Sequence, residues 1–195
     1  MLYRFSMRIL PRSTGVALAA LATLLLSGCL PSAPVVTPEP LPTSTPVFAS
    51  DEMALAAATE AYRAYLAMSD QILIDGGSRP ERIEAVSTIG WAKKQMPGFR
   101  EATDKGLRST GGTTFDTVSL QRYDAGSPDG VDIVQVYLCI DVSAVNVFDS
   151  SGASVVKSTR PGRSAVEVSF DSASEGARKL LVASVDPWPG TDFCA

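Results

Sequence analysis

The chain has 195 residues, of which 45% are hydrophobic and 19% charged, and its formal net charge at pH 7 is −4. An acidic balance disfavours nucleic acids and anionic lipid surfaces as partners, because both are polyanions. The chain contains no histidine, which excludes Ser-His-Asp and Cys-His nucleophile activation and the usual catalytic zinc sites. The sequence also lacks a Walker-type phosphate loop and a Gly-x-Gly-x-x-Gly fingerprint, so we expect no cofactor.

Residues 1–28 are typical of the signal peptide of a bacterial lipoprotein. Three arginines, at positions 4, 8 and 12, precede an apolar core at residues 15–26. As a helix this core would reach about 18 Å, which is short of the roughly 30 Å hydrocarbon layer of a bilayer. Residues 26–29 read LSGC and resemble the lipobox, in which the cysteine thiol receives a diacylglyceryl group before cleavage. We therefore predict lipidation at Cys29; the alternative is a plain secretory signal or an uncleaved anchor.

A tether follows at residues 29–49, between the lipidated cysteine and a globular domain at residues 50–195. The stretch 31–50 contains six prolines and one charged residue, which favours an extended, polyproline-like conformation that could span about 60 Å. Cleavage of the leader removes three arginines and no acidic residue from the chain. The mature chain then has 14 basic and 21 acidic residues and a formal charge of −7.

Helical periodicity dominates the first part of the domain. Ser50 is a suitable N-cap for a long amphipathic helix that the glycines at 76–77 end. Residues 78–81 match a capping box and predict a second short helix. We expect Pro-Gly at 97–98 to interrupt the apolar stripe, leaving residues 99–105 as a third helical piece.

Alternating periodicity dominates the second part. Short turns separate the predicted strands, which argues for antiparallel pairing. The predicted strands are residues 114–123, 131–147, a return strand that starts at 155–156 and ends before a turn at 160–162, 165–171 and 179–185. The sequence therefore predicts an α+β fold in which N-terminal helices pack on a curved antiparallel sheet of four to six strands.

The order of these elements from Ser50 to Cys194 resembles the nuclear transport factor 2-like superfamily of cystatin-like cones, which includes polyketide-cyclase-like and steroid-isomerase-like domains. The resemblance covers the long helix, the short helices and the meander that contains residues 134–141, VQVYLCID. It implies a cone-shaped roll with a pocket between sheet and helix. It implies no catalytic residue, because fold alone does not define function.

Cys139 and Cys194 are the two cysteines of the mature domain. Exported chains meet an oxidising environment, so we predict a disulfide that fastens the C-terminal segment to the sheet. The alternatives are two buried free thiols or a redox-active pair, although the Cys-x-x-Cys spacing that lowers a thiol pKa is absent.

A buried carboxylate beside a phenol is the remaining candidate for proton chemistry. The candidates are Asp116, Asp132 and Asp141 with Tyr123 or Tyr137. Hydrogen-bonded aspartates on the strand surface are the alternative interpretation of the same residues.

Residues 124–130, DAGSPDG, suggest a calcium loop at first sight. They lack the regular oxygen spacing and the terminal glutamate of an EF-hand loop. We therefore predict a hairpin turn and no metal.

These observations predict an extracytoplasmic protein that is lipid-anchored to the bacterial cell membrane. We expect its domain to be a binding or interaction module of the cell envelope, with an envelope protein or a small hydrophobic ligand as partner and no nucleic acid. The alternative is a small proton-transfer enzyme of the steroid-isomerase-like or polyketide-cyclase-like type.

Replacing Cys29 by alanine removes the sulfur nucleophile that lipidation requires, so we expect the variant to leave the membrane fraction. Two or three acyl chains hold a protein on a bilayer far more firmly than one. Fractionation of cells expressing Cys29→Ala and the parent chain measures this. A variant that stays firmly bound to membranes would contradict lipidation.

Overall fold

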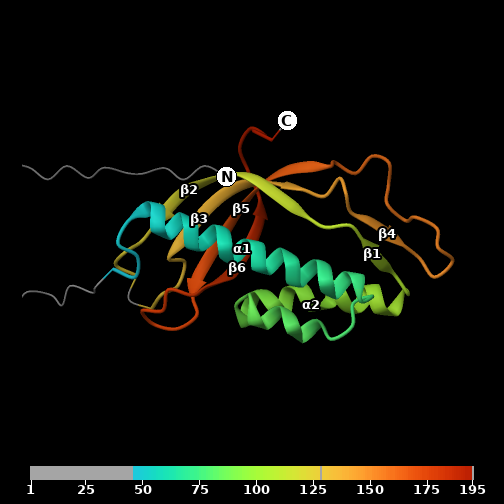
Figure 1. Ribbon diagram of the computed structural model, residues 1–195, viewed down its shortest axis with the longest axis horizontal. Coiled ribbons are helices and arrows are strands. Elements are labelled where there is room, and N and C mark those ends of the chain that lie inside the picture. Colours follow the sequence, from blue (N-terminus) through green and yellow to red (C-terminus); the bar gives the residue numbers. More distant parts are fainter. Residues whose placement is uncertain (1–45, 128, 195) are drawn as a thin grey trace, which may run out of the picture. The chain divides into compact units, whose positions relative to one another are not determined.

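The computed structural model describes residues 46–127 and 129–194, and it has the predicted α+β architecture (Figure 1). The leader, Cys29 and the tether up to residue 45 lie outside the described residues. In chain order the elements are α1 (Asp51–Ile74), the 3₁₀-helix η1 (Pro80–Ala85), α2 (Ile89–Asp104), β1 (Arg108–Thr110), β2 (Thr114–Tyr123), β3 (Val134–Asp141), β4 (Asn146–Phe148), β5 (Arg163–Ser172) and β6 (Leu180–Pro187). Within this part of the chain no helix combines the length and hydropathy of a membrane span.

Helix α1 begins at the predicted cap. The Ser50 hydroxyl accepts a hydrogen bond from the Met53 backbone N–H, and Asp75 caps the other end. Gly77 follows with a φ of +79°, and a Cβ there would lie 1.9 Å from the Phe99 carbonyl oxygen. Only glycine satisfies both conditions, and the tight turn brings the chain back so that α2 packs beside α1.

The second helical segment differs from the prediction, because it is a 3₁₀-helix without a capping box. Its N-cap is Arg79, which has a φ of 50° and makes no side-chain cap hydrogen bond. The Arg82 guanidinium holds this turn instead, donating to the Asp75 carboxylate and to the carbonyl oxygens of Ser78 and Arg79. A charged side chain thus replaces the Ser-Glu pair that the sequence suggested.

Helix α2 continues through Pro97, so the predicted interruption and the separate third piece are wrong. Proline removes the hydrogen bond that would reach the Lys93 carbonyl. Both Pro97 and Lys93 are exposed, so water can satisfy that carbonyl. Trp91 and Phe99, buried on either side of the proline, keep the helix on the core.

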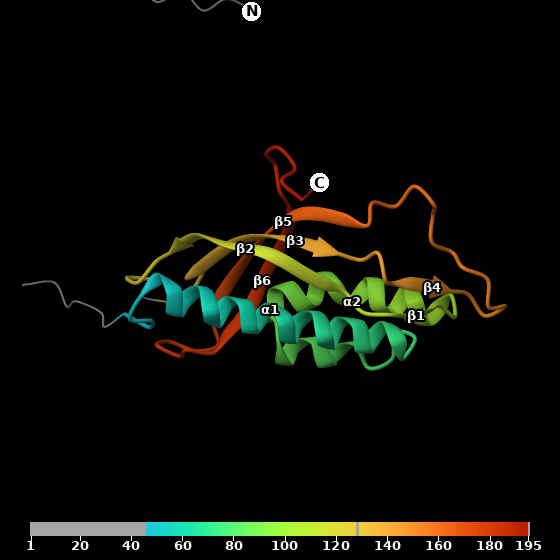
Figure 2. The same cartoon turned by 45° about the horizontal axis from the view of Figure 1, so that its top comes forward.

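Four antiparallel strands in the order β2-β3-β5-β6 form the main sheet, and α1 lies across one of its faces with α2 beside it (Figures 1 and 2). The register places Val136 of β3 opposite Val168 of β5, and Phe170 of β5 opposite Val182 of β6. All four side chains are buried. The alternating residues of the sheet thus form the floor of the core, as the strand periodicity predicts.

A second, two-stranded ribbon pairs β1 with β4, and the alternating pattern of the sequence does not predict it in this form. The predicted strand 131–147 is two strands, β3 and β4, separated by a turn. Residues 155–156 are not a strand, and Val155 is 46% exposed. A Cβ on Gly111 would lie 2.0 Å from the Ala144 carbonyl oxygen, so a glycine is required where β1 leaves this ribbon.

The C-terminal tail covers part of the outer face of the sheet. The sulfurs of Cys139 and Cys194 lie 2.04 Å apart, at the distance of the predicted disulfide. Beside them Tyr137, Trp188 and Phe193 pack in pairs with ring centroids 5.4 to 6.1 Å apart. Cys139 is therefore fully buried although it points away from the helices.

Candidate functional site

A cavity of about 330 Å³ lies where α1, α2 and one end of the sheet meet. Helix α1 forms one wall, α2 a second, and the sheet with the residue before β2 a third. From α1 the lining residues are Tyr62, Tyr65, Leu66, Ser69, Asp70 and Leu73; from α2 they are Trp91 and Gln95; from the sheet side they are Thr113, Ile140, Val142 and Val185. The walls are thus mostly apolar or aromatic, with a few polar groups among them, as in small-molecule sites.

The α1 wall follows from helical spacing. Its six lining residues recur at intervals of one, three or four positions between residues 62 and 73, and so share one face of the helix. The N-terminal part of this face is apolar, but Ser69 and Asp70 bring polar groups into it near its C-terminal end. The cavity lies along the part of α1 where this face changes from apolar to polar side chains.

Three aromatic side chains form the inner end of the cavity. The Tyr65 hydroxyl accepts a 3.1 Å hydrogen bond from Trp91 Nε1, which links α1 to α2. Tyr62 stacks on Tyr65 with ring centroids 6.0 Å apart and meets Phe115 of β2 edge-on at 5.1 Å. Packing on both sides thus holds the three rings in place.

The Tyr62 hydroxyl is buried without a hydrogen-bond partner among the described residues. The residue is only 1% exposed. Burial raises its pKa far above the ordinary value of a phenol, with a smaller contribution from neighbouring Tyr65. Burial also raises the pKa of Tyr65, although the hydrogen bond from Trp91 opposes the shift. Both phenols therefore stay protonated at neutral pH.

Asp70 fastens the cavity wall on α1 to the start of β2. Its two carboxylate oxygens accept hydrogen bonds from the backbone N–H and the hydroxyl of Thr113, at 2.7 and 2.8 Å. The side chain takes part in no salt bridge within the described residues. No lysine or arginine lines the cavity. The cavity therefore carries one carboxylate and no opposing basic group.

A second hollow, of about 300 Å³, lies beside α1 and differs in kind. Its lining includes Ala57, Ala61 and Leu180, with Glu60 and Arg178 among its polar groups. Both polar side chains are exposed, so their positions are free to change. This hollow has no buried polar side chain that would orient a ligand, and the cavity beside Tyr62 is the better candidate.

None of the three predicted aspartates is among the residues that line the cavity. Asp116 accepts two hydrogen bonds of 2.8 Å from the Arg163 guanidinium, which holds its pKa below the usual value. Asp141 lies 3.8 Å from the same guanidinium. Tyr123 bonds to the main chain ahead of α1, and Tyr137 packs in the tail cluster. Within the described residues, no hydrogen bond joins any of these aspartates to Tyr123 or Tyr137.

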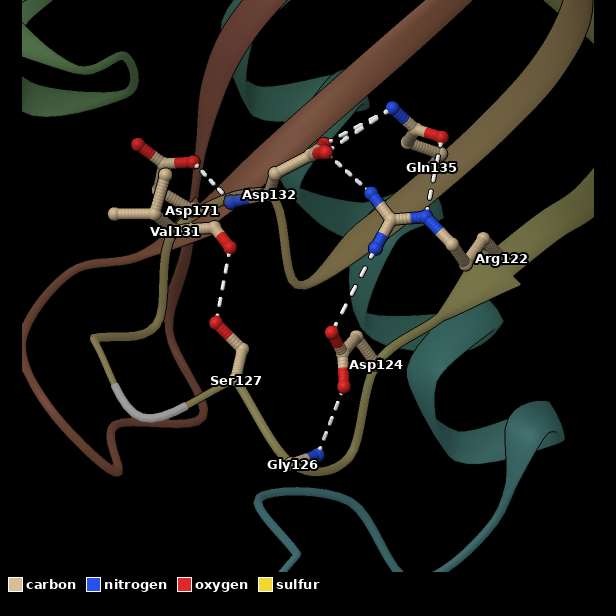
Figure 3. A network of polar contacts seen from close by, with 8 residues as sticks. All are labelled: Arg122, Asp124, Gly126, Ser127, Val131, Asp132, Gln135 and Asp171. Carbon is tan, nitrogen blue, oxygen red and sulfur yellow. Dashed lines mark hydrogen bonds and ion pairs between the residues drawn. The ribbon is translucent and has the colours of Figure 1, made fainter. Parts of the chain in front are cut away.

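The third predicted aspartate, Asp132, belongs to a polar network at the β2–β3 turn (Figure 3). Its carboxylate accepts hydrogen bonds from Arg122 and Gln135, and its backbone N–H donates to Asp171 at 2.7 Å. Arg122 also lies 3.8 Å from Asp124. One guanidinium thus pairs with two of the carboxylates, those of Asp124 and Asp132. In the described segments, no group of three or more His, Cys, Asp or Glu residues could hold a metal ion. The turn joins antiparallel β2 and β3 as the predicted hairpin.

The resemblance implies a pocket between sheet and helix, but the residues that line this cavity were not predicted from the sequence as a binding site. The helical spacing places Tyr62, Tyr65 and Trp91 in the core, where they do lie. Asp70 provides the charged group of the cavity. The sequence feature that could have revealed it is a carboxylate at a helical position that belongs to the apolar face of α1. Its partner Thr113 lies 43 residues away in the chain, so only the tertiary fold brings the two together.

We predict that the protein loses stability in alkaline solution. Above about pH 10 the unfolded chain releases phenolic protons, whereas Tyr62 and Tyr65 keep theirs in the fold because burial raises their pKa. The unfolded state then binds fewer protons than the folded state, so the free energy of unfolding falls as the pH rises. Denaturant unfolding at a series of alkaline pH values measures this, and Tyr62→Phe should make the fall shallower. An unchanged slope in that variant would contradict the burial of the phenol.

No family model matches the chain, and neither a curated protein nor a solved structure matches it. The likeness to nuclear transport factor 2-like domains therefore stays a prediction from the order of elements. The function has to be argued from the chemistry of the site itself.

Proposed function

We propose that this chain is a lipoprotein of the bacterial cell envelope whose domain binds a small molecule in the cavity beside Tyr62. The leader and Cys29 support the location, because the basic segment, the short apolar core and the LSGC tetrapeptide match what lipoprotein processing requires. The cavity supports the activity. Binding, rather than a reaction, is the function that its side chains favour.

The observation that carries the proposal is the unpartnered hydroxyl of Tyr62. Leaving a buried polar group without a hydrogen bond costs about 1–3 kcal/mol, and folded proteins contain few such groups. Tyr62 lines the cavity, its hydroxyl has no partner in the described residues, and the residue is 1% exposed. The hydroxyl has less than 1 Å² of accessible surface, so a ligand with a hydrogen-bonding group would recover that lost interaction after a small shift of the Tyr62 ring.

The walls suit binding because they are held in place before a ligand arrives. The hydrogen bond from Trp91 to Tyr65 joins the two helices, and the bonds from Thr113 to Asp70 join α1 to the sheet. Preorganised groups lose little conformational entropy when a ligand binds. Ser69, Asp70 and Gln95 are only half-buried, which gives a ligand access from solvent.

A large docking surface for a protein partner has less support. Contiguous exposed apolar patches are the usual mark of protein interaction sites. In the described part of the chain, the large apolar side chains that are exposed belong to helices, loops and the tail rather than to any strand. They are Met53, Ile74, Ile89, Val131, Val155 and Phe193. The tail also covers part of the outer sheet face, so the cavity remains the favoured site.

A fragment screen detected by nuclear magnetic resonance tests the proposal. The library contains cationic, anionic and neutral aromatic fragments. The readout is the Nε1–H signal of each tryptophan. We expect binders to shift the signal of Trp91, which lines the cavity, and to leave that of Trp188, which packs in the tail cluster. A library without any binder that shifts Trp91 would contradict the proposed function.

Two substitutions on α2 show whether binding takes place in the cavity. Gln95→Phe places a ring in the cavity wall and should abolish the shifts at Trp91. Lys93→Phe makes a similar apolar change at an exposed position of the same helix and should leave them. Equal loss in both variants would mean that the fragments respond to a change in the helix and not to the cavity.

A further inference from the structure

The charge of the cavity restricts which ligands it can hold. Asp70 contributes a carboxylate, no basic side chain lines the cavity, and the described salt bridges do not include this residue. Lys94, whose Nζ lies 5.7 Å from the centre of the Trp91 ring, is exposed and is not a lining residue. A negatively charged ligand would meet repulsion from Asp70, and a positively charged ligand would meet attraction.

The aromatic rings favour the same sign of charge. Tyr62, Tyr65 and Trp91 all line the cavity, and the face of each ring carries negative electrostatic potential. A cation within about 6 Å of such a ring is stabilised by about 0.5–2 kcal/mol, more when it is shielded from water. Aromatic rings beside a carboxylate therefore favour the binding of an ammonium group.

Hydrogen-bond acceptors complete this setting. A protonated primary amine has three N–H donors and no acceptor. The half-buried Asp70 oxygens retain lone pairs beyond those that Thr113 uses and can accept from it. The unpartnered hydroxyl of Tyr62 can accept a further N–H after a small shift of its ring. Leu66, Leu73 and Ile140 offer apolar surface for the rest of the molecule.

We propose that the cavity binds a small organic cation, namely a protonated amine attached to an apolar or aromatic body. This inference rests on the proposed function, because it names the ligand class of the same cavity. It follows from the juxtaposition of Asp70, three aromatic rings and the unpartnered Tyr62 hydroxyl, with no basic residue in the lining.

Three probes of nearly equal size and different charge test the ligand class: phenethylammonium, phenethyl alcohol and phenylacetate. Each is titrated into the domain while the Nε1–H signal of Trp91 is followed, with the signal of Trp188 as internal reference. We expect phenethylammonium to bind about tenfold more tightly than the alcohol, in line with a cation–π contact and a nearby carboxylate. Phenylacetate should bind most weakly.

Asp70→Asn identifies the source of the preference. It removes the charge but keeps an oxygen that can accept from Thr113, so it should reduce the advantage of the ammonium over the alcohol to less than threefold. Asp104→Asn makes the same change at an exposed position at the end of α2 and should leave the advantage intact. Titration of the parent domain alone still decides the ligand class if Asp70→Asn does not fold.

The outcomes separate this inference from the proposed function. An alcohol or a carboxylate that binds as tightly as the ammonium overturns the ligand class, while the cavity remains a binding site. Failure of all three probes also overturns the ligand class, and the fragment screen then decides whether the cavity binds anything. Absence of binding in both experiments overturns both proposals.

Discussion

Helix α1 has to pack one face against two different surfaces, and the rest of the structure depends on this constraint. Towards its N-terminus the face meets the sheet through small residues such as Ala54 and Ala58, which are fully buried. Farther along, the same face also meets α2, and large side chains fill the wider space. Tyr62 and Tyr65 stand at this change, and beyond them the packing leaves the cavity of about 330 Å³.

Polar contacts hold these surfaces together, because apolar packing alone does not fix the angle between two helices and a sheet. One joins Tyr65 to Trp91 across the helices, and another joins Asp70 to Thr113 across α1 and the sheet. The first contact satisfies groups that would otherwise be buried and unpaired, and the second joins two half-buried residues. Tyr62 lies in the same wall, and the absence of a partner for its hydroxyl among the described residues sets it apart.

Much of the fold follows from local pattern, and much of the site does not. The Ser50 cap, the strands 114–123 and 165–171 and the Cys139–Cys194 pair were predictable, because periodicity, capping and cysteine count act locally or through the export environment. Pro97 was mispredicted because tertiary packing of Trp91 and Phe99 outweighs the loss of one solvent-facing hydrogen bond. The ribbon of β1 and β4 was missed because strands of three residues carry too little periodicity. The cavity depends on contacts between distant segments, which no single stretch of sequence reveals.

Unfolding free energies of Tyr62→Phe and Tyr65→Phe test the central claim most directly, since each variant removes one hydroxyl from the same wall. If the Tyr62 hydroxyl has no partner in the unliganded domain, its removal should leave the free energy of unfolding unchanged or raise it by about 1 kcal/mol. Removal of the Tyr65 hydroxyl deprives Trp91 Nε1–H of its acceptor and should lower that free energy by about 1–3 kcal/mol. Equal destabilisation by the two variants would show that Tyr62 is an ordinary hydrogen-bonded core residue and would contradict the account.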